Sequence, residues 1–351
     1  MLTSLSSGCG VLSLMRLLVL TLVSLWSLPS YALEEIDDSE LSDMHGQSLF
    51  VASYAANAGF GFYRLAVDAQ LDLNTNIKRL ALGCDGAGGT GVCDIDISNL
   101  RLTGVGATSA ADSGPGRDFM LRRPYLEFAV KNPGNPATRE VSGMRFGAYE
   151  SLGVMSVGEN PNINDLNDDT GITRLSGEMN VRVTNATLTN VGVTSVGICC
   201  VIGPTTATIA SHQQNLVLRR AQTASLTGMS AVAIGLTLNN TNLNNQPLRS
   251  IHNIQVSEAN GSPTKDFYLG VQKENILWQR VSTGAFAGNP AEKGWWMSIP
   301  DVQIPNLTTN QSIRIGTLDV IGGLFGGAVN VNPVDLQQRP VDNCWGPTTF
   351  C

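Results

Sequence analysis

Written in blocks of five residues, the middle of the chain reads Val181-Arg-Val-Thr-Asn, Ala186-Thr-Leu-Thr-Asn, Val191-Gly-Val-Thr-Ser, Val196-Gly-Ile-Cys-Cys200. Each block begins with a small or β-branched residue and carries an apolar residue at its third place. An amphipathic helix needs apolar residues at three-and-four spacing, which this stretch lacks. A single flat strand needs unbroken alternation, and the phase slips here at each Thr-Asn pair. Short β-segments with corners fit better, because Asn and Ser side chains bond their own backbone.

The same spacing returns at Leu238, Leu243 and Leu248, each of which is followed by a polar pair. Repetition at a short fixed period is typical of a coiled β-stack, and the two patches resemble pentapeptide-repeat proteins. The alternative is an ordinary antiparallel sheet with Asn-rich turns, because a stack needs about three repeats for stability. The sequence therefore predicts an all-β chain: an extended or curved antiparallel sheet or sandwich with partial β-solenoid-like repeats and disulfide-clipped loops.

Residues 1–32 have the layout of a secretory signal peptide. Arg16 precedes an apolar run, and Ser30-Tyr-Ala32 forms a small-x-small cleavage site. The run of about 13 residues is too short for a comfortable transmembrane helix. Because no charged side chain precedes Met15, translation starts at either Met1 or Met15. The predicted localisation is outside the cytoplasm, at the cell surface, on the outer membrane or in the periplasm.

Composition excludes one class of partner. The chain has 22 basic and 29 acidic residues and a net charge of −7, and loss of Arg16 with the signal makes the mature chain more negative. Nucleic acid calls for a basic face, so it is not an expected partner. No segment after the signal is long and apolar enough to predict a transmembrane helix.

The cysteines predict disulfides. Of seven cysteines, Cys9 lies in the signal segment, and an even number remains, which in an exported chain favours bonding. The expected short-range pairs are Cys84 with Cys93 and Cys344 with Cys351. Cys199 and Cys200 either bond each other or displace one of these pairs, so the connectivity stays open.

The sequence predicts the following organisation: a signal peptide at 1–32, an acidic leader at 33–47, an N-terminal β region at 48–159, a polar connector at 160–171, a repeat-containing C-terminal β region at 172–330 and a Cys-clipped tail at 331–351. The leader is either a solvated, flexible segment or a recognition or processing tag. The stretch from Ile313 to Val320 is the last expected strand, followed by an apolar, glycine-rich run.

The connector holds the best metal candidate. Asp165, Asn167 and Asp169 alternate, which is how oxygen ligands converge on calcium. In an EF-hand loop, however, Gly171 and Glu178 would each have to stand earlier. A structural calcium site is therefore one hypothesis, a plain turn rich in Asn and Asp is the alternative, and no other cofactor is implied.

Trp295 and Trp296 form the most aromatic point of the chain. Paired tryptophans stack on sugars or anchor a partner protein. The alternative is that they close the end of a β core, since adjacent strand residues face opposite sides of a sheet.

Signs of catalysis are missing. The histidines are His45, His212 and His252, and none stands in a metal-ligand spacing. No Gly-x-Ser-x-Gly elbow occurs. The glycine-rich loop after Gly83 leads into a strand instead of a helix, so a disulfide-closed hairpin is expected there and phosphate binding is not. The chain is predicted not to be an enzyme.

Several distinctive motifs together resemble a family of exported Gram-negative proteins assigned to pilus assembly, the Fil type. They are Leu41-Ser-Asp-Met-His-Gly-Gln47, Asn162-Ile-Asn-Asp-Leu166, Leu248-Arg-Ser-Ile-His-Asn-Ile254, Asp266-Phe-Tyr-Leu269, Lys293-Gly-Trp-Trp-Met-Ser-Ile-Pro300 and the cysteine-flanked glycine loop. The resemblance implies an envelope protein linked to surface appendages and supplies no catalytic residues. The chain departs from true pilins, because it lacks a type IV pilin start and a detached donor strand.

We therefore expect an exported structural or adhesive protein of the bacterial envelope or cell surface, associated with pilus or appendage assembly. Its expected partners are other envelope or pilus proteins or further copies of itself, met through exposed strand edges. One alternative is an outer-membrane β-barrel, which would need aromatic girdles in a chain that is only 6% aromatic. The other is a secreted carbohydrate-binding protein or enzyme that uses Trp295 and Trp296.

Overall fold

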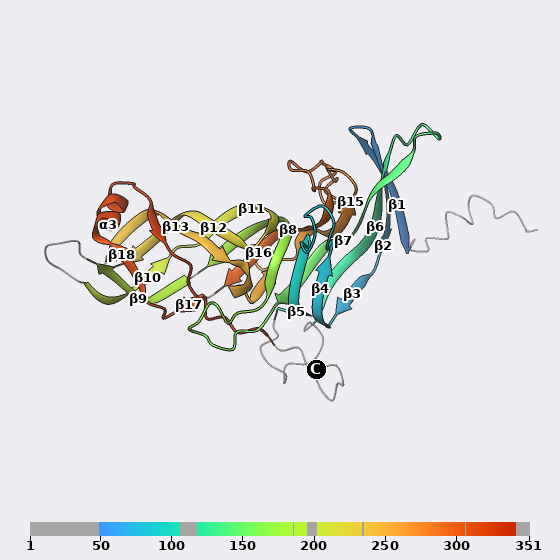
Figure 1. Ribbon diagram of the computed structural model, residues 1–351. Coiled ribbons are helices and arrows are strands. Elements are labelled where there is room, and N and C mark those ends of the chain that lie inside the picture. Colours follow the sequence, from blue (N-terminus) through green and yellow to red (C-terminus); the bar gives the residue numbers. More distant parts are fainter. Residues whose placement is uncertain are drawn as a thin grey trace, which may run out of the picture. The chain divides into compact units, whose positions relative to one another are not determined.

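The computed structural model describes residues 49–105, 118–184, 186–194, 202–233, 235–305 and 307–341. These residues belong to one compact unit, Leu49–Cys351, and they form almost only β-strands (Figure 1). The prediction of an all-β chain is confirmed. The expected signal peptide, the leader at 33–47 and four of the cysteines, Cys199, Cys200, Cys344 and Cys351, lie outside the described residues.

The first sheet has twelve strands. They are β1 (Phe50–Asn57), β2 (Phe60–Val67), β3 (Gln70–Leu73), β4 (Thr75–Leu82), β5 (Ile95–Thr103), β6 (Phe119–Lys131), β7 (Glu140–Ser156), β8 (Ile172–Thr184), β11 (His212–Ala221), β14 (Asn253–Val256), β15 (Thr264–Gln272) and β16 (Gly294–Pro305). Their order is β1-β2-β6-β7-β14-β16-β8-β5-β4, with β3 beside β6, β11 beside β8, and β15 between β7 and β16. Because β5 pairs with β7 as well as β8, part of this sheet closes on itself.

The second sheet has seven strands in the order β17-β9-β10-β12-β13-β19, with β18 beside β9. They are β9 (Ala186–Thr194), β10 (Ile202–Ile209), β12 (Thr223–Ala233), β13 (Leu236–Pro247), β17 (Thr308–Thr309), β18 (Ile313–Gly316) and β19 (Val329–Val331). Within the described ranges, the helical elements are the short 3-10 turn η1 (Leu248–Ser250) and the helix α3 (Thr317–Leu324).

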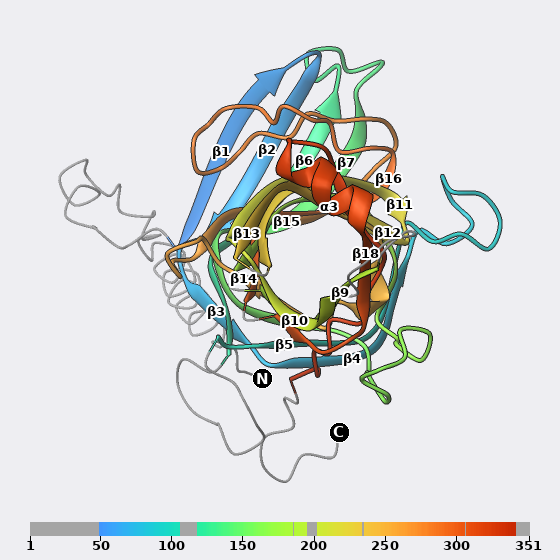
Figure 2. The same ribbon diagram turned by 90° about the vertical axis from the view of Figure 1, so that its left-hand side faces the viewer.

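Both sheets contribute to one apolar core. Val181 and Val183 on β8 belong to it, and so do Val191 on β9, Leu238 on β13 and Ile299 on β16. Figure 2 shows strands of both sheets arranged around a common interior, which these side chains fill. The stretch Val181–Thr194 is where the chain crosses from the first sheet to the second, so its inward-facing residues serve both sheets.

The five-residue period marks bulges in long antiparallel strands. Strand β13 pairs with β12, and its register shifts between Gln246 and Leu243, between Leu243 and Thr241, and again before Leu238. Asn240 and Asn245, five residues apart, both have a positive φ. Asn tolerates this conformation better than most residues, so each Asn resets the alternation and the next apolar residue again points inward. Of the two predicted arrangements, the antiparallel sheet is the one that these strands adopt.

The glycine loop is clipped as predicted. Strands β4 and β5 form an antiparallel hairpin, and a disulfide joins Cys84 to Cys93 across its loop. The next residue, Asp94, is almost fully buried. Its carboxylate accepts hydrogen bonds from Arg220 Nε at 2.7 Å and from the backbone N–H of Trp295 at 2.9 Å. The clipped loop is thereby fixed to β11 and β16.

Two glycines make room for this carboxylate. Gly83 and Gly294 both have a positive φ, and a Cβ on either would lie within 2.3 Å of Asp94 Oδ2. Any larger residue at these positions would collide with the group that ties the hairpin to the sheet.

The C-terminal part departs from prediction. The strand expected from Ile313 to Val320 ends at Gly316, and α3 follows at Thr317. The apolar, glycine-rich run after Val320 is therefore partly helical. Gly323 allows α3 to lie close to β19, because a side chain at this position would collide with Val329.

Leu238→Ala should reduce the free energy of unfolding by about 2–5 kcal/mol, because Leu238 is 3% exposed and its removal leaves a cavity in the shared core. Leu236→Ala on the same strand is the matched control. Leu236 is 39% exposed, so its loss should cost less than about 1 kcal/mol. Urea denaturation measures both variants, and equal losses would contradict a core shared by the two sheets.

Candidate functional site

Three strands of the first sheet bury charged side chains and expose their apolar neighbours. Arg64 on β2, Glu127 on β6 and Arg145 on β7 are all buried. They stand side by side, because Arg64 pairs with Glu127 and Glu127 pairs with Arg145. We call these three residues the charged row. A sheet normally turns its apolar face inward, so this part of the sheet is inverted.

The charged row forms hydrogen bonds within the protein, and Arg64 Nε is the one buried nitrogen of the row without a partner. Glu127 accepts hydrogen bonds from Arg64 Nη2 at 2.8 Å and from Arg145 Nε. The Arg145 guanidinium also lies 4.8 Å from the ring centres of Tyr268 and Trp278, within the range of cation–π attraction. The carboxylate of Glu127 offsets one of the two positive charges, and the aromatic rings stabilise the guanidinium of Arg145.

Residues 273–293, which we call the covering loop, close this face of the sheet. Trp278 and Ile276 from the loop are buried against Phe62, whose ring centre lies 5.6 Å from that of Trp278. Gln279 accepts hydrogen bonds from Arg64 through its side chain and from Arg145 through its backbone carbonyl. The loop thus leaves Glu127 and Arg145 almost no exposed surface and Arg64 only 7%.

The opposite face of the same strands is apolar and exposed. Its side chains, which we call the apron, are each at least 36% exposed: Tyr54 on β1, Tyr63 and Leu65 on β2, Leu126 and Phe128 on β6, and Met144 and Phe146 on β7. They form two lines across the sheet. Leu65 pairs with Leu126, which pairs with Phe146, and Tyr63 pairs with Phe128, which pairs with Met144. No charged side chain interrupts either line.

The apron continues the surface of the main core. Leu269 on β15 pairs with Phe146 on one side and with Met297 on the other, and Met297 belongs to the core. Large exposed apolar patches on soluble proteins mark interaction surfaces or ligand grooves. The apron is therefore the strongest candidate functional surface among the described residues.

The two tryptophans lie on opposite faces of β16. Trp296 is 1% exposed and packs in the smaller core with Trp278, whereas Trp295 is half-buried against the main core. Trp296 thus has no open ring face for a sugar or a partner. Trp296 is thus a core residue, and Trp295 packs against the main core with part of its surface exposed.

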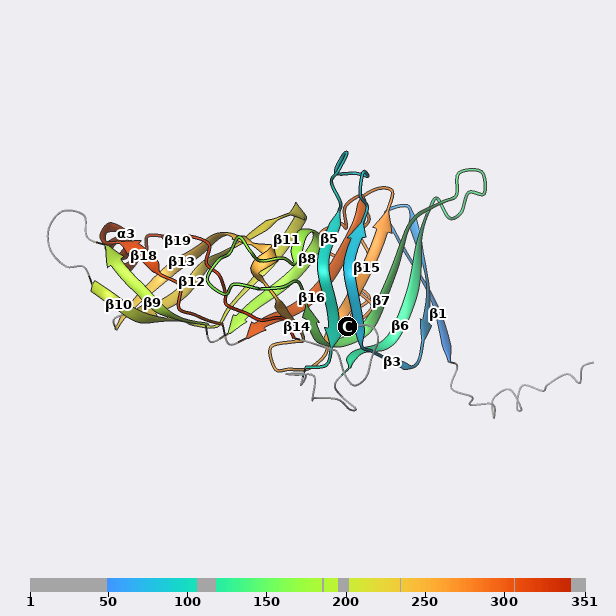
Figure 3. The same ribbon diagram turned by 60° about the horizontal axis from the view of Figure 1, so that its bottom comes forward.

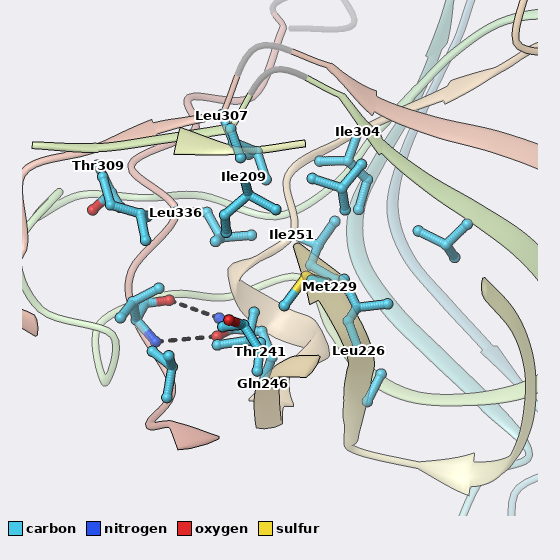
Figure 4. A pocket seen from close by; sticks show the side chains of 18 of the residues that line it. Ile209, Leu226, Met229, Thr241, Gln246, Ile251, Ile304, Leu307, Thr309 and Leu336 are labelled. Atoms are coloured by element: carbon cyan, nitrogen blue, oxygen red, sulfur yellow. Dashed lines mark hydrogen bonds between the residues drawn. The ribbon is translucent and has the colours of Figure 1, made fainter. Parts of the chain in front are cut away.

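A cavity of about 100 Å³ lies within the shared core. Figure 4 shows aliphatic side chains such as Leu226, Ile304 and Leu336 around it. Gln246 is among the few polar residues in its wall, and it bonds the backbone of Val334 with both ends of its amide, at 2.7 and 3.1 Å. A binding pocket needs polar groups that orient a ligand. Here that amide is engaged within the protein, so the wall that surrounds the cavity is almost entirely apolar.

A separate group of buried polar residues links distant segments. Asp169 and His252 are buried, and Asp169 Oδ1 lies 3.6 Å from His252 Nε2. His252 Nδ1 lies 2.9 Å from the carbonyl oxygen of Val157, which only accepts, so Nδ1 carries a proton. Nε2 of the neutral ring is then an acceptor that faces the carboxyl group. Asp335 is also fully buried nearby and accepts from Asn160 at 3.4 Å.

The electrostatics favour neutral forms at this position. Burial, together with the neighbouring Asp335 carboxylate, raises the pKa of Asp169 to about 7. Burial lowers the pKa of His252 and raises that of Asp335. A protonated Asp169 would face His252 Nε2 as a donor faces an acceptor at 3.6 Å, and neither carboxyl oxygen of Asp169 nor Nε2 has another partner.

Two of the three calcium candidates, Asp165 and Asn167, contact each other within a turn. Asp165 Oδ1 accepts hydrogen bonds from the backbone and side-chain nitrogens of Asn167 at 2.9 and 3.1 Å, as in a turn rich in Asn and Asp. Asp169 is buried beside His252 instead. Within the described ranges, no group of three or more His, Cys, Asp or Glu side chains is arranged to hold a metal ion.

Comparison with family models, curated proteins and solved structures finds no match to this chain. In the part of the chain that the structure describes, no helix is long and apolar enough to cross a membrane.

Sequence reasoning missed both the charged row and the apron. In Tyr63-Arg64-Leu65, Leu126-Glu127-Phe128 and Met144-Arg145-Phe146, alternation predicts the apolar residues inside and the charge outside. The available signal was the recurrence of the pattern: three strands each place one charge, of alternating sign, between two large apolar residues. Such charges can neutralise one another only if the strands lie side by side.

Glu127→Ala should lower the free energy of unfolding by about 3–5 kcal/mol, because it leaves two buried guanidinium groups without a counter-charge. Glu140→Ala is the control, since the Glu140–Lys273 ion pair lies on the surface, with both side chains more than half exposed. Its loss should cost less than about 1 kcal/mol. Chemical denaturation compares the two variants, and a Glu127 variant as stable as the control would show that the row is not buried.

Asp169→Asn should gain stability relative to the wild type as the pH rises from about 4 to about 7. In that window the folded wild type binds more protons at Asp169 than the unfolded chain does, so its stability contribution falls with rising pH. Asn does not titrate, and the relative gain should exceed about 1 kcal/mol. Urea denaturation at several pH values measures it, with Asp168→Asn, at an exposed neighbour, as the control. If the stability of the Asp169 variant relative to the wild type stays constant or falls over this pH range, the raised pKa of Asp169 is contradicted.

Proposed function

We propose that this chain is an exported structural or adhesive protein of the bacterial envelope or cell surface, associated with the assembly of pili or other appendages. It acts by presenting the apron to another macromolecule, which covers it. Support comes from the signal-like start of the sequence, from the motifs shared with the pilus-assembly family and from the exposed apolar face of the first sheet.

One observation carries the proposal. Burial of the charged row requires a covering loop, two aromatic rings and a paired network, while the large apolar residues between the charges stay in water. A chain selected only to fold as a monomer would gain by reversing this pattern, because burying a Leu or Phe side chain contributes about 1.5–3 kcal/mol. An inverted sheet is stable and useful where a partner later covers the apolar face.

Antibody labelling of intact and permeabilised cells, viewed by electron microscopy, tests the location. Intact cells that produce the wild type should be labelled at the surface or along filaments. Phe146→Glu places a charge in the middle of the apron, so the variant should be exported but lost from the cell surface into the medium.

Val232→Glu is the matched control, because Val232 is an exposed apolar residue of the second sheet and is not part of the apron. It should label like the wild type. Labelling only after permeabilisation would contradict a surface function. Normal retention of the Phe146 variant would contradict docking through the apron.

A further inference from the structure

The cavity in the shared core has an aliphatic wall. Among the described residues that line it, none is aromatic or charged, and the polar ones are Thr241, Gln246 and Thr309. The others are alanines, larger aliphatic residues and methionines. Protein interiors leave few voids larger than a water molecule, and a void lowers stability. A cavity of about 100 Å³ inside the main core therefore needs a physical explanation.

Four buried alanines on neighbouring strands leave the space open. Ala207 on β10 pairs with Ala233 on β12. Two residues further along β10, Ile209 pairs with Ala231 on β12 and with Ala186 on β9. All four alanines line the cavity. Strands favour larger, β-branched residues, and one of these at any of the four positions would fill part of the void.

The cavity is long and narrow. Its lining on β12 runs from Ala224 to Ala233, which is about 25–30 Å at about 3.3 Å per residue. Figure 4 shows Leu226 and Met229 of the same strand beside the cavity. A volume of about 100 Å³ along a wall of this length forms a narrow channel instead of a round hole.

We propose that this cavity binds a linear alkyl chain, either as a free molecule or as the end of a lipid acyl chain. A polar ligand needs orienting groups, whereas hydrocarbon has no polar atoms and matches an aliphatic wall. An apolar cavity of about 150 Å³ in another protein binds benzene, so the volume here has room for about four to six carbon atoms. A flexible chain fits a narrow channel better than a flat ring does. Binding at this site does not depend on the apron.

One part of the wall belongs to neither sheet and gives a longer chain a way out. Figure 3 shows this segment, residues 332–341, running from β19 toward the first sheet. Its Val334 and Leu336 line the cavity. Gln246 and Thr309 hold the backbone here through side-chain hydrogen bonds of 2.7–3.1 Å. Moving the segment aside breaks these bonds but no strand pairing.

Nuclear magnetic resonance of the full purified chain, with isotope-labelled methionine methyl groups, tests the proposal. Met229 lines the cavity, whereas Met144 is exposed on the apron. Titration with hexanol should shift the Met229 signal until it saturates and should cause no saturable shift at Met144. Hexanediol has the same length but a hydroxyl group at each end, so it should leave the Met229 signal in place.

Ala231→Leu should abolish the Met229 shift, because the larger side chain fills the cavity. Ala52→Leu is the matched control, since Ala52 is exposed on β1, and this variant should bind hexanol like the wild type. Thermal unfolding verifies that both variants are folded. If Ala231→Leu is not, the smaller substitution Ala231→Val takes its place.

Dihexanoyl phosphatidylcholine, dissolved as single molecules, separates the two sources of the chain. A saturable Met229 shift with this lipid supports binding of an acyl chain end, whereas a shift with hexanol alone supports binding of a free chain. The proposal is overturned if hexanol gives no saturable shift at Met229, or if Met144 or hexanediol responds equally. Unchanged binding after the cavity is filled also overturns it. Surface labelling with the Phe146 variant tests the proposed function independently of all these outcomes.

Discussion

The parallel pairing of β8 and β9 with β16, β17 and β18 is the contact on which the rest of the structure depends. Strand β16 pairs with β8 in the first sheet, and β17 and β18 pair with β9 in the second. The segment from β8 to β9 and the segment from β16 to β18 therefore run next to each other where the chain passes from the first sheet to the second. This crossing forces the two sheets to share an interior, and Val181, Val191, Ile304 and Ile315 fill it from both sides.

The shared interior also explains why the inverted sheet lies at its border. Strand β7 has seventeen residues, and Ala148, in its middle, belongs to the core. Its earlier part extends past the core, where no second sheet covers the same face. Met144 and Phe146 thus point to the same side of β7 as Ala148, but they are exposed to solvent. The covering loop instead protects the other side, and for that reason the charged row lies there.

Local chemistry allowed much of the fold to be predicted. Strand content, the Cys84–Cys93 bond and the opposite facing of Trp295 and Trp296 follow from alternation and spacing. The bulges at Asn240 and Asn245 were visible as phase slips, although their geometry admitted two arrangements. The candidate site was not predictable in this way, because Arg64, Glu127 and Gln279 meet only through long-range pairing. The same holds for Asp169 and His252, which are neighbours only in the folded chain.

The position of the covering loop has a consequence for the order of folding. Synthesis runs from the N-terminus, so β2, β6 and β7 exist well before β15, which pairs with β7, and well before residues 273–293, which close over them. Contacts between segments so far apart in sequence form slowly, and unpaired strands are prone to aggregate in the meantime. The nascent chain must keep Arg64, Glu127 and Arg145 hydrated until its last third arrives. Strands β2, β6 and β7 are therefore synthesised early, but the burial of their charged row is completed late.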